Sequence, residues 1–190
     1  TQPSKSVIYE YETVDGEPHA VDATNINAYL VDAPNVFLLN RGSPIRAVPA
    51  MRFGSMPRDG GHLIMKEAEK EAFLALEPEA AELVRTYIGS DEFINGYSRY
   101  CLWLLDVPPD RLRRLPQIMA RVEKVREFRL ASKAATTRKF AETPAIFCQL
   151  AQPMTDYLLV PGVSSERRHY IPIGFMPAKV IANNLVFTVP

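Results

Sequence analysis

The chain has 190 residues, of which 47% are hydrophobic and 23% charged, the proportions of a globular domain with its own core. No apolar run approaches the roughly 18 residues of a membrane span, and the start of the chain lacks a signal-peptide pattern, so we expect no membrane partner. The net charge of zero conceals two unlike halves: residues 1–92 hold 8 basic and 15 acidic residues, whereas residues 93–190 hold 14 and 7. This asymmetry favours a polyanion-binding face on the basic half over a chance segregation of solvated charges.

The first third of the chain carries few signals of regular structure. Residues 1–65 are predicted to be irregular β structure, with a candidate strand over 36–39. Residues 51–61, MRFGSMPRDGG, combine glycines with a proline and predict a loop built from turns. Within that loop, the run 59–61 (Asp-Gly-Gly) supplies positions where the backbone can take a positive φ.

Two helices and a strand are predicted next. Apolar residues recur on one face of a helix over 66–76. Pro78 is expected to begin a second helix that runs through Ile88, and Gly89 is expected to end it. The continuous apolar run 100–105, YCLWLL, then predicts a strand that is buried on both faces.

A second pair of helices is predicted in the basic half. Asp110 follows two prolines and is a suitable N-cap for a short helix that reaches Leu115. Pro116 interrupts the apolar pattern, because it lacks a backbone N–H, and begins a longer helix to Leu130. The polar face of this pattern carries Arg114, Arg121, Lys124 and Arg129. The helix over 116–130 and the basic residues after it are predicted to hold phosphates.

The last part of the chain is predicted to be rich in strands. Branched and aromatic residues indicate strands over 145–150, 157–160, 170–175 and 180–189. Because strands and helices do not alternate strictly, the pattern favours an α+β fold over a doubly wound parallel sheet. We expect a mixed, mainly antiparallel sheet with two helix pairs.

The sequence contains no catalytic or metal-binding motif. The three histidines lie at none of the spacings of a metal-binding helix, and Cys101 and Cys148 belong to no CxxC pair. No serine lies in a GxSxG elbow, and the glycines form neither GxGxxG nor a P-loop. Both cysteines lie in apolar runs, which favours buried free thiols and a reducing cytoplasm, although a disulfide stays open. We expect neither a catalytic residue nor a metal ligand in this chain.

The densest group of hydrogen-bonding side chains lies between the strands predicted over 157–160 and 170–175. Arginine pairs with guanine edges, and hydroxyl groups bind phosphates, so this group predicts contact with a nucleic acid. The alternative is that its arginines are solvated or paired with a nearby acid. The group comprises Ser164, Ser165, Glu166, Arg167, Arg168 and His169, and a second phosphate-binding candidate comprises Thr136, Thr137, Arg138 and Lys139.

The chain resembles the target recognition domain of MmeI-like (type IIL) restriction–modification enzymes. The resemblance implies sequence-specific binding of double-stranded DNA by a fold of target-recognition-domain type. Any one matching motif is weak, but the ordered set spans nearly the whole chain. The matching segments are 25–30 (NINAYL), 54–61 (GSMPRDGG), 89–96 (GSDEFING), 99–103 (RYCLW), Phe128-Arg129 with Ser132, 160–168 (VPGVSSERR) and 170–174 (YIPIG).

The resemblance also implies what the rest of the protein does. We expect residues 1–190 to be a single target recognition domain, cut from a longer chain of the bacterial cytoplasm. Upstream domains of that chain would methylate adenine with S-adenosylmethionine and would cut DNA with Mg²⁺, so no cofactor is expected in this fragment. The predicted DNA-binding residues are Ser164, Ser165, Arg167, Arg168, His169, Arg138, Lys139 and Arg58.

Two other roles stay open at this point. Much of the chain, especially residues 1–92, could instead pack on the methyltransferase domain of the same polypeptide, with residues 51–61 as an interdomain or backbone-clamping loop. A small hydrolase, whose Asp, His and Ser meet only in space, is the other alternative. Within the leading hypothesis, the bases that distinguish this protein are expected to be read by residues 154–156, by residues 175–179 or by residues beyond 190.

Overall fold

The computed structural model describes residues 6–37 and 39–190. The chain divides into two compact units, residues 1–47 and 48–190. This boundary differs from the charge boundary at residues 92 and 93, because the acidic helix α1 (Glu67–Leu76) belongs to the second unit. The expectation of a single recognition domain over 1–190 stays a prediction.

The first unit contains an antiparallel pair of strands, β1 (Ser6–Glu10) and β2 (His19–Ala23). The turn that follows is held by Asp32, whose carboxylate accepts backbone N–H groups from Thr24 and Asn25 at 3.0 and 2.8 Å. The hydrogen bond from the Asn25 N–H, together with those from the Thr24 hydroxyl and N–H, lowers the pKa of the exposed Asp32 carboxyl. The strand expected over 36–39 is wrong at 36, 37 and 39, which are irregular, and Leu38 lies outside the described residues.

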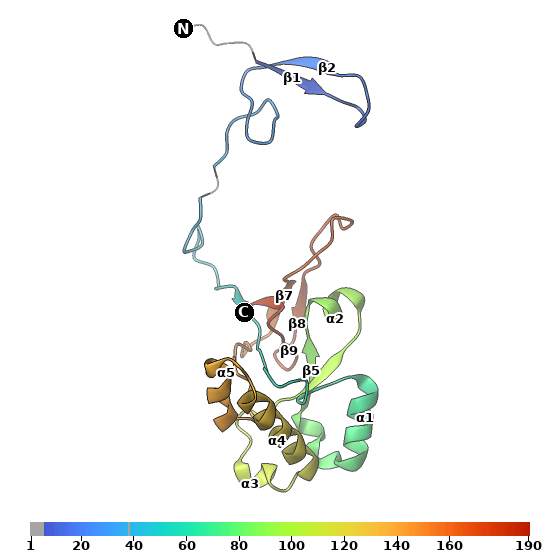
Figure 1. The fold of residues 1–190 in the computed structure, drawn as a ribbon, viewed down its shortest axis with the longest axis vertical. Helices are drawn as coiled ribbons and strands as arrows, with labels where there is room; N and C mark the ends of the chain where they lie inside the picture. The colour runs from blue at the N-terminus through green and yellow to red at the C-terminus, as the bar shows by residue number, and fades with distance from the viewer. Residues whose placement is uncertain (1–5, 38) are drawn as a thin grey trace. The chain divides into compact units, whose positions relative to one another are not determined.

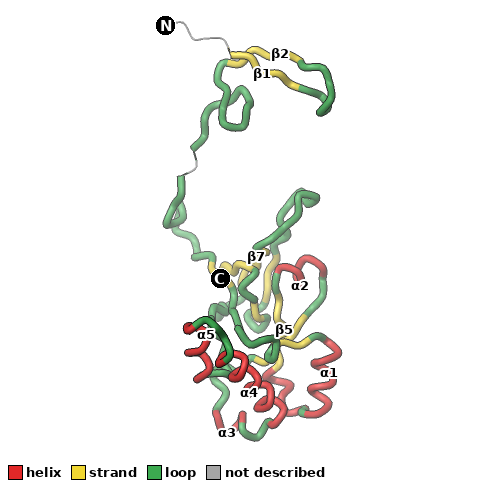
Figure 2. The backbone as a smooth tube through the Cα atoms, viewed as in Figure 1, coloured by secondary structure: helices red, strands yellow, loops and turns green. Residues whose placement is uncertain are grey.

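The second unit contains both helices and sheets (Figures 1 and 2). Its helices are α1, α2 (Ser90–Asn95), α3 (Pro109–Leu112), α4 (Pro116–Leu130) and α5 (Ala135–Lys139), with 3₁₀ segments η1 (Pro78–Leu83) and η2 (Phe140–Glu142). Its strands are β3 (Arg52–Phe53), β4 (Ile64–Met65), β5 (Val84–Ile88), β6 (Arg99–Leu102), β7 (Tyr157–Pro161), β8 (Gly174–Met176), β9 (Ile181–Ala182) and β10 (Val186–Val189).

The strands of the second unit form two sheets among the described residues. One has the order β3-β10-β7-β8 and is antiparallel throughout. The other has the order β4-β6-β5-β9, in which only the β5–β9 pair is parallel. The predicted α+β class with mixed, mainly antiparallel pairing is therefore confirmed.

The main core lies between the second of these sheets and the helices α1 and α4. Ile118, Val122 and Val125 line the buried side of α4 and belong to one cluster with Leu102 and Trp103 of the β6 segment. Burying apolar area of this kind is worth about 25 cal/mol per Å². A smaller cluster, which includes Tyr157, Leu159, Ala182 and Val186, lies behind the first sheet.

A buried carboxylate fixes where α4 begins. Pro116 occupies its first turn, where a missing N–H costs nothing. The next two N–H groups, of Gln117 and Ile118, donate to the Glu77 carboxylate at 3.0 Å each. A negative group at a helix N-terminus is favourable, so Glu77 both caps α4 and ties it to α1. The two helices predicted over 66–76 and 116–130 are confirmed.

The helix predicted from Pro78 to Ile88 is wrong in its second half. The 3₁₀ segment η1 ends at Leu83, and residues 84–88 form strand β5 between β6 and β9. The β-branched residues Val84, Thr86 and Ile88 suit a central strand, and pairing on both edges outweighs local helix propensity. Gly89 does not end a helix but is the N-cap of α2.

Several other boundaries differ from the predictions. Residues 145–150 form no strand and contribute only an isolated bridge between Gln149 and Met56. Residues 170–173 are irregular, so β8 begins only at Gly174. Residues 180–189 form two short strands instead of one, and residues 135–139, for which no element was predicted, form helix α5. Pro108, not Asp110, is the N-cap of α3.

The loop 51–61 is held inside the second unit by one buried guanidinium. Arg129, on α4, is fully buried. Its five N–H groups donate to five backbone carbonyls at 2.7–3.0 Å, those of Pro57, Arg58, Phe140, Thr143 and Ile146. Burial lowers the pKa of Arg129, yet arginine stays charged at neutral pH. The predicted phosphate contact of Arg129 is therefore wrong, because no nucleic acid can reach its side chain.

Replacing Arg129 by lysine should lower the free energy of unfolding by about 3 kcal/mol, measured by urea denaturation. A lysine ammonium has three donors for five carbonyls, and each buried acceptor left without a donor costs about 1–3 kcal/mol. The matched control is Arg126→Lys on the same helix, where an exposed pair with Glu123 should contribute less than about 1 kcal/mol. Equal stability of the two variants would contradict the role given to Arg129.

The two cysteines are free, and Cys101 is buried while Cys148 is half-buried. Burial raises the pKa of both thiols, and only the thiolate is nucleophilic. In mildly alkaline buffer, Cys148 should react with iodoacetamide before Cys101, as followed by mass spectrometry of the two peptides. Both should react quickly in concentrated guanidinium chloride, and equal rates in the folded protein would contradict this order.

Candidate nucleic-acid interface

The main candidate site is an exposed loop, residues 162–173, which we call the recognition loop. It leaves β7, projects beyond α2 and returns to β8 (Figure 1). Residues 162–171 are all exposed. The structure therefore places the predicted site residues of this segment together on one projecting loop: Ser164, Ser165, Arg167, Arg168 and His169.

A local turn shapes the tip of the recognition loop. The Arg168 N–H donates to the Ser165 carbonyl at 3.0 Å, and the Arg167 N–H donates to Ser165 Oγ at 3.2 Å. Both hydrogen bonds use Ser165 as the acceptor, so its own O–H remains able to donate. The turn thus presents two successive arginine side chains away from the strands.

The guanidinium groups of the recognition loop have no partner among the described residues. No hydrogen bond or ion pair joins the side chain of Arg167, Arg168 or Glu166 to another group in the described part of the chain. The alternative that these arginines pair with Glu166 therefore finds no support in the structure. Two adjacent unpaired cations on an exposed loop attract a polyanion, and each guanidinium offers a planar fork to a phosphate or a guanine edge.

The recognition loop also exposes apolar side chains. Tyr170 is 87% exposed and Phe175, at the start of β8, is 82% exposed. Val163, Ile171 and Ile173 are also exposed. Such side chains contact thymine methyl groups or wedge between base steps in protein–DNA complexes. This exposure differs from the strand predicted over 170–175, because alternate side chains of a strand would be buried.

Arg58, Arg138 and Lys139 form a separate set. The Arg58 guanidinium donates to Thr137 Oγ1 of α5 at 3.2 Å, so two segments far apart in sequence meet here. Arg138 donates to the carbonyls of Ser132 and Lys133 at 2.8 Å each, which occupies part of its donor set. Lys139 is exposed. Helix α5 lies well away from the recognition loop (Figure 1), so the structure does not bring the two predicted sets together.

The basic face predicted along α3 and α4 is largely engaged within the protein. Arg121 donates to the His62 carbonyl at 2.8 Å and forms an ion pair with Glu69, while Arg129 is buried. Lys124 and Arg114 remain exposed. The predicted phosphate-binding role of this face is therefore wrong at Arg129, whose guanidinium is buried. At Arg121 the guanidinium is already bonded to a carbonyl and a carboxylate, so fewer of its N–H groups are available to a phosphate.

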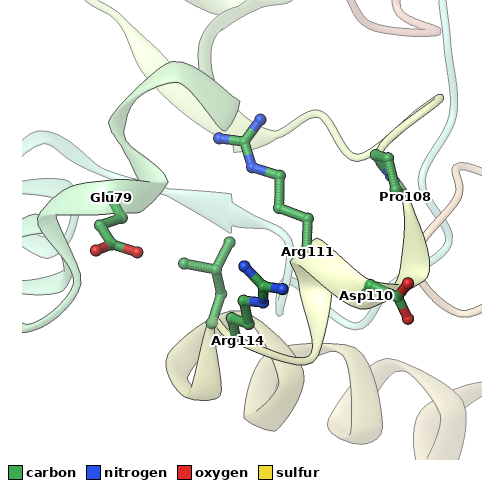
Figure 3. A pocket seen from close by; sticks show the side chains of 6 residues that line it. Glu79, Pro108, Asp110, Arg111 and Arg114 are labelled. Atoms are coloured by element: carbon green, nitrogen blue, oxygen red, sulfur yellow. The ribbon is translucent and has the colours of Figure 1, made fainter.

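Arg114 lines a hollow of about 430 Å³ between α3 and η1 (Figure 3). Arg111 lies beside it and forms an ion pair with Glu82. Glu79 of η1 and Asp110 of α3 also line the hollow (Figure 3). Acidic and basic groups are balanced around this hollow, and of the basic residues predicted on the polar helix face only Arg114 lines it among the described residues.

The residues expected to read the bases, 154–156 and 175–179, are divided by the structure. Phe175 and Met176 lie in β8, close to the recognition loop, whereas residues 154–156 and 177–179 meet at the opposite ends of β7 and β8, where Asp156 Oδ1 accepts the Ala178 N–H at 2.9 Å. Met154 beside them is almost fully exposed. Residues 154–156 and 177–179 therefore form one surface, which is separated from the recognition loop by the length of β7.

The structure offers little to the hydrolase alternative. His62 and Glu69 line one pocket, but Glu69 is paired with Arg121 and no serine, threonine or cysteine lines that pocket in the described part of the chain. Within residues 6–37 and 39–190, no group of three or more His, Cys, Asp or Glu side chains lies close enough together to hold a metal ion. No helix in these ranges is long and apolar enough to cross a membrane.

Comparison with known proteins agrees with the resemblance seen in the sequence. A family model described as the MmeI target recognition domain matches residues 32–190. DNA methyltransferase A of Bacillus subtilis (strain 168) is 35% identical over 187 residues, which are 98% of this chain and 21% of that protein. A solved structure of the type IIL restriction–modification enzyme MmeI in complex with DNA is 45% identical, with a TM-score of 0.82 over 98% of this chain and 25% of that one.

The chain spans about a fifth to a quarter of the length of these relatives. The family model matches most of the chain, and the solved structure is similar to this chain in both sequence and fold. The chain belongs to the MmeI target recognition domain family.

Proposed function

We propose that this chain selects the DNA sequence on which a longer enzyme acts, and that the recognition loop enters a groove of duplex DNA. The observation that carries the proposal is the loop itself: it projects from two paired strands and presents the guanidinium groups of Arg167 and Arg168 without a partner among the described residues. A relative of the same fold is known in complex with DNA, which supports DNA as the polyanion. The chain-wide split of charge supports the same choice.

The proposed contacts divide into two kinds. Arg167 and Arg168 would supply base contacts or paired phosphate contacts through their planar forks. Ser164, Ser165 and His169 would bind phosphates or sugar oxygens and so fix the register of the loop. Tyr170 and Phe175 would add apolar contact within the groove. Arg58 and Lys139, on their separate surface, would hold the backbone further along the duplex.

The rest of the enzyme would lie outside these 190 residues. We propose a bacterial, cytoplasmic parent chain that methylates adenine at N6 with S-adenosylmethionine and in some members also cuts DNA with Mg²⁺. The names of the relatives, a DNA methyltransferase and a restriction–modification enzyme, support this proposal. The methyltransferase domain of the same polypeptide would then be the second partner of this chain, beside double-stranded DNA.

A second candidate role, packing on that methyltransferase domain, is favoured by apolar surface. The outer face of the β3-β10-β7-β8 sheet carries Phe53, Phe187 and Phe175, and the first two rings lie 4.5 Å apart. Phe53 is about half exposed. Within the loop 51–61, which was considered for this role, Gly54, Ser55 and Asp59 are buried in the unit, whereas Phe53 and Arg58 are exposed.

Substituting Arg167 or Arg168 by alanine should separate base contact from phosphate contact. The target site is first found by selecting duplexes from a random pool with the 190-residue chain or its parent. An arginine that reads a base should cost about 1–3 kcal/mol at one base pair only. An arginine that binds a phosphate should weaken all sequences alike and reduce the salt slope by about one unit.

Arg113→Ala is the matched control for these variants. Arg113 is exposed on α3 and forms an ion pair with Asp110, so the substitution removes the same charge from another surface. Its affinity for the selected duplex should stay close to that of the unchanged chain, as measured by fluorescence anisotropy at several salt concentrations. If the Arg167 and Arg168 variants behaved like this control, the recognition loop would not be the DNA-binding element.

A further inference from the structure

Both ends of the recognition loop are held by the same short helix. Gly162 begins the loop after β7, and Gly174 ends it at the start of β8. Each of these glycines contacts a different residue of α2, whereas the eleven residues between them have no side-chain hydrogen bond to the body of the protein among the described residues. Helix α2 lies beside β7 and β8 in Figure 1.

The first end is held by a hydroxyl group. Ser90 is buried at the start of α2, and its Oγ donates to the Leu185 carbonyl at 2.6 Å and accepts the Gly162 N–H at 3.0 Å. The Gly162 N–H also points to the Leu185 carbonyl, at 3.0 Å. A Cβ on Gly162 would lie 2.6 Å from that carbonyl oxygen. Hydrogen bonds and close backbone approach together fix where the loop leaves β7.

The second end is held by an aromatic ring. A Cβ on Gly174 would lie 2.9 Å from the Phe93 ring. The ring therefore lies directly against the backbone at the point where the loop returns. Phe93 itself belongs to the apolar cluster of Tyr157, Leu159 and Val186, so the loop end is connected to the core of the first sheet.

Helix α2 is itself fixed to the other sheet. Its buried Glu92 accepts the Gly89 N–H at 2.7 Å and forms an ion pair with Arg99 of β6 at 2.6 Å. A Cβ on Gly89 would lie 2.1 Å from Asn183 Nδ2. A helix of six residues is too short to be stable alone, so these contacts fix the position of α2. Because α2 contacts both ends of the recognition loop, it fixes the positions of those ends.

We infer that α2 is the positioning element of the recognition loop, and that Ser90 and Phe93 act as positioning residues for sequence discrimination without contacting DNA. The inference rests on the proposed function and adds to it a pair of residues behind the DNA-facing surface. Base contacts require the backbone of the arginine to be held in place, because a displaced guanidinium loses one of its two hydrogen bonds to the base. Phosphate attraction tolerates a mobile loop, since it depends on charge rather than on register.

The test compares Ser90→Ala and Phe93→Leu with two controls in the 190-residue chain. Asn95→Ala changes an exposed residue of the same helix whose amide bonds only to Asp91, and Ser90→Thr keeps the hydroxyl group. Trypsin cleavage after Arg167 and Arg168 in the folded protein reports loop opening without any DNA. The loss of one hydrogen bond should speed cleavage roughly 2–10-fold in Ser90→Ala, with little change in Asn95→Ala and Ser90→Thr.

The second readout is the ratio of affinities for the selected duplex and a scrambled one. This ratio should fall by a similar factor in Ser90→Ala and Phe93→Leu, while affinity for the scrambled duplex and its salt slope stay unchanged. Global unfolding, followed by urea denaturation, separates this effect from a loss of folded protein, which would lower both affinities together and would overturn the inference.

The outcomes distinguish this inference from the proposed function. Unchanged cleavage in both α2 variants would overturn the inference whatever DNA binding shows. Faster cleavage with an intact affinity ratio would also overturn it, provided that Arg167→Ala or Arg168→Ala lowers DNA binding in the same assay. If neither arginine variant affects DNA binding, the proposed function fails, and the positioning role for discrimination fails with it.

Discussion

The second unit depends on the guanidinium of Arg129 more than on any other single group. A buried charge costs several kcal/mol unless it is fully hydrogen-bonded, and here five backbone carbonyls supply one acceptor for each N–H. The carbonyls come from loops 57–58 and 140–146, which have no regular pairing with each other. The hydrogen bonds of Arg129 therefore hold these two segments against α4 in place of strand pairing. The five carbonyls satisfy the guanidinium without an ion pair to a carboxylate.

A series of hydrogen bonds connects the segment held by Arg129 to the start of the recognition loop. Residues 54–56 of the loop 51–61 lie between β9 and residues 149–151. The Ser55 N–H donates to the Ala182 carbonyl at 2.7 Å, and Ser55 Oγ accepts the Ala151 N–H at 3.0 Å. The turn at Asn183 follows, and the Leu185 carbonyl beyond it meets Ser90 and the first residue of the loop. Each step is a hydrogen bond of 2.6–3.0 Å. A loop whose ends are fixed this way loses less conformational entropy when it binds.

The arginines of this chain illustrate two opposite uses of one side chain. Arg129 has all its donors satisfied by the protein and serves stability, whereas Arg167 and Arg168 have none satisfied by described side chains and stay available to a ligand. Arg121 lies between these extremes, with one carbonyl and one carboxylate as partners. Composition and position on a predicted helix face do not separate these cases, because the acceptors come from segments distant in sequence.

The sequence was informative where local patterns are strong. The periodic helices over 66–76 and 116–130, the strand β7 and the polar segment at Ser164–His169 all agree with the structure. It was misleading where pairing partners decide the outcome: residues 84–88 carry residues compatible with both helix and strand, and become β5 because β6 and β9 flank them. Likewise residues 145–150 look like a strand, but Arg129 and the bridge to Met56 hold them as an irregular segment.

By itself, the sequence determined the α+β class, the family and the location of the recognition loop, because these depend on composition, motif order and residue type. Only the tertiary structure decided which basic residues face solvent and which hold the core together, since each guanidinium is satisfied or left free by carbonyls and carboxylates far along the chain. It also decided that α2 supports both ends of the recognition loop. That arrangement depends on two glycines that contact Ser90 and Phe93, about 70 to 80 residues away in the sequence. Local propensity does not determine contacts between residues so far apart.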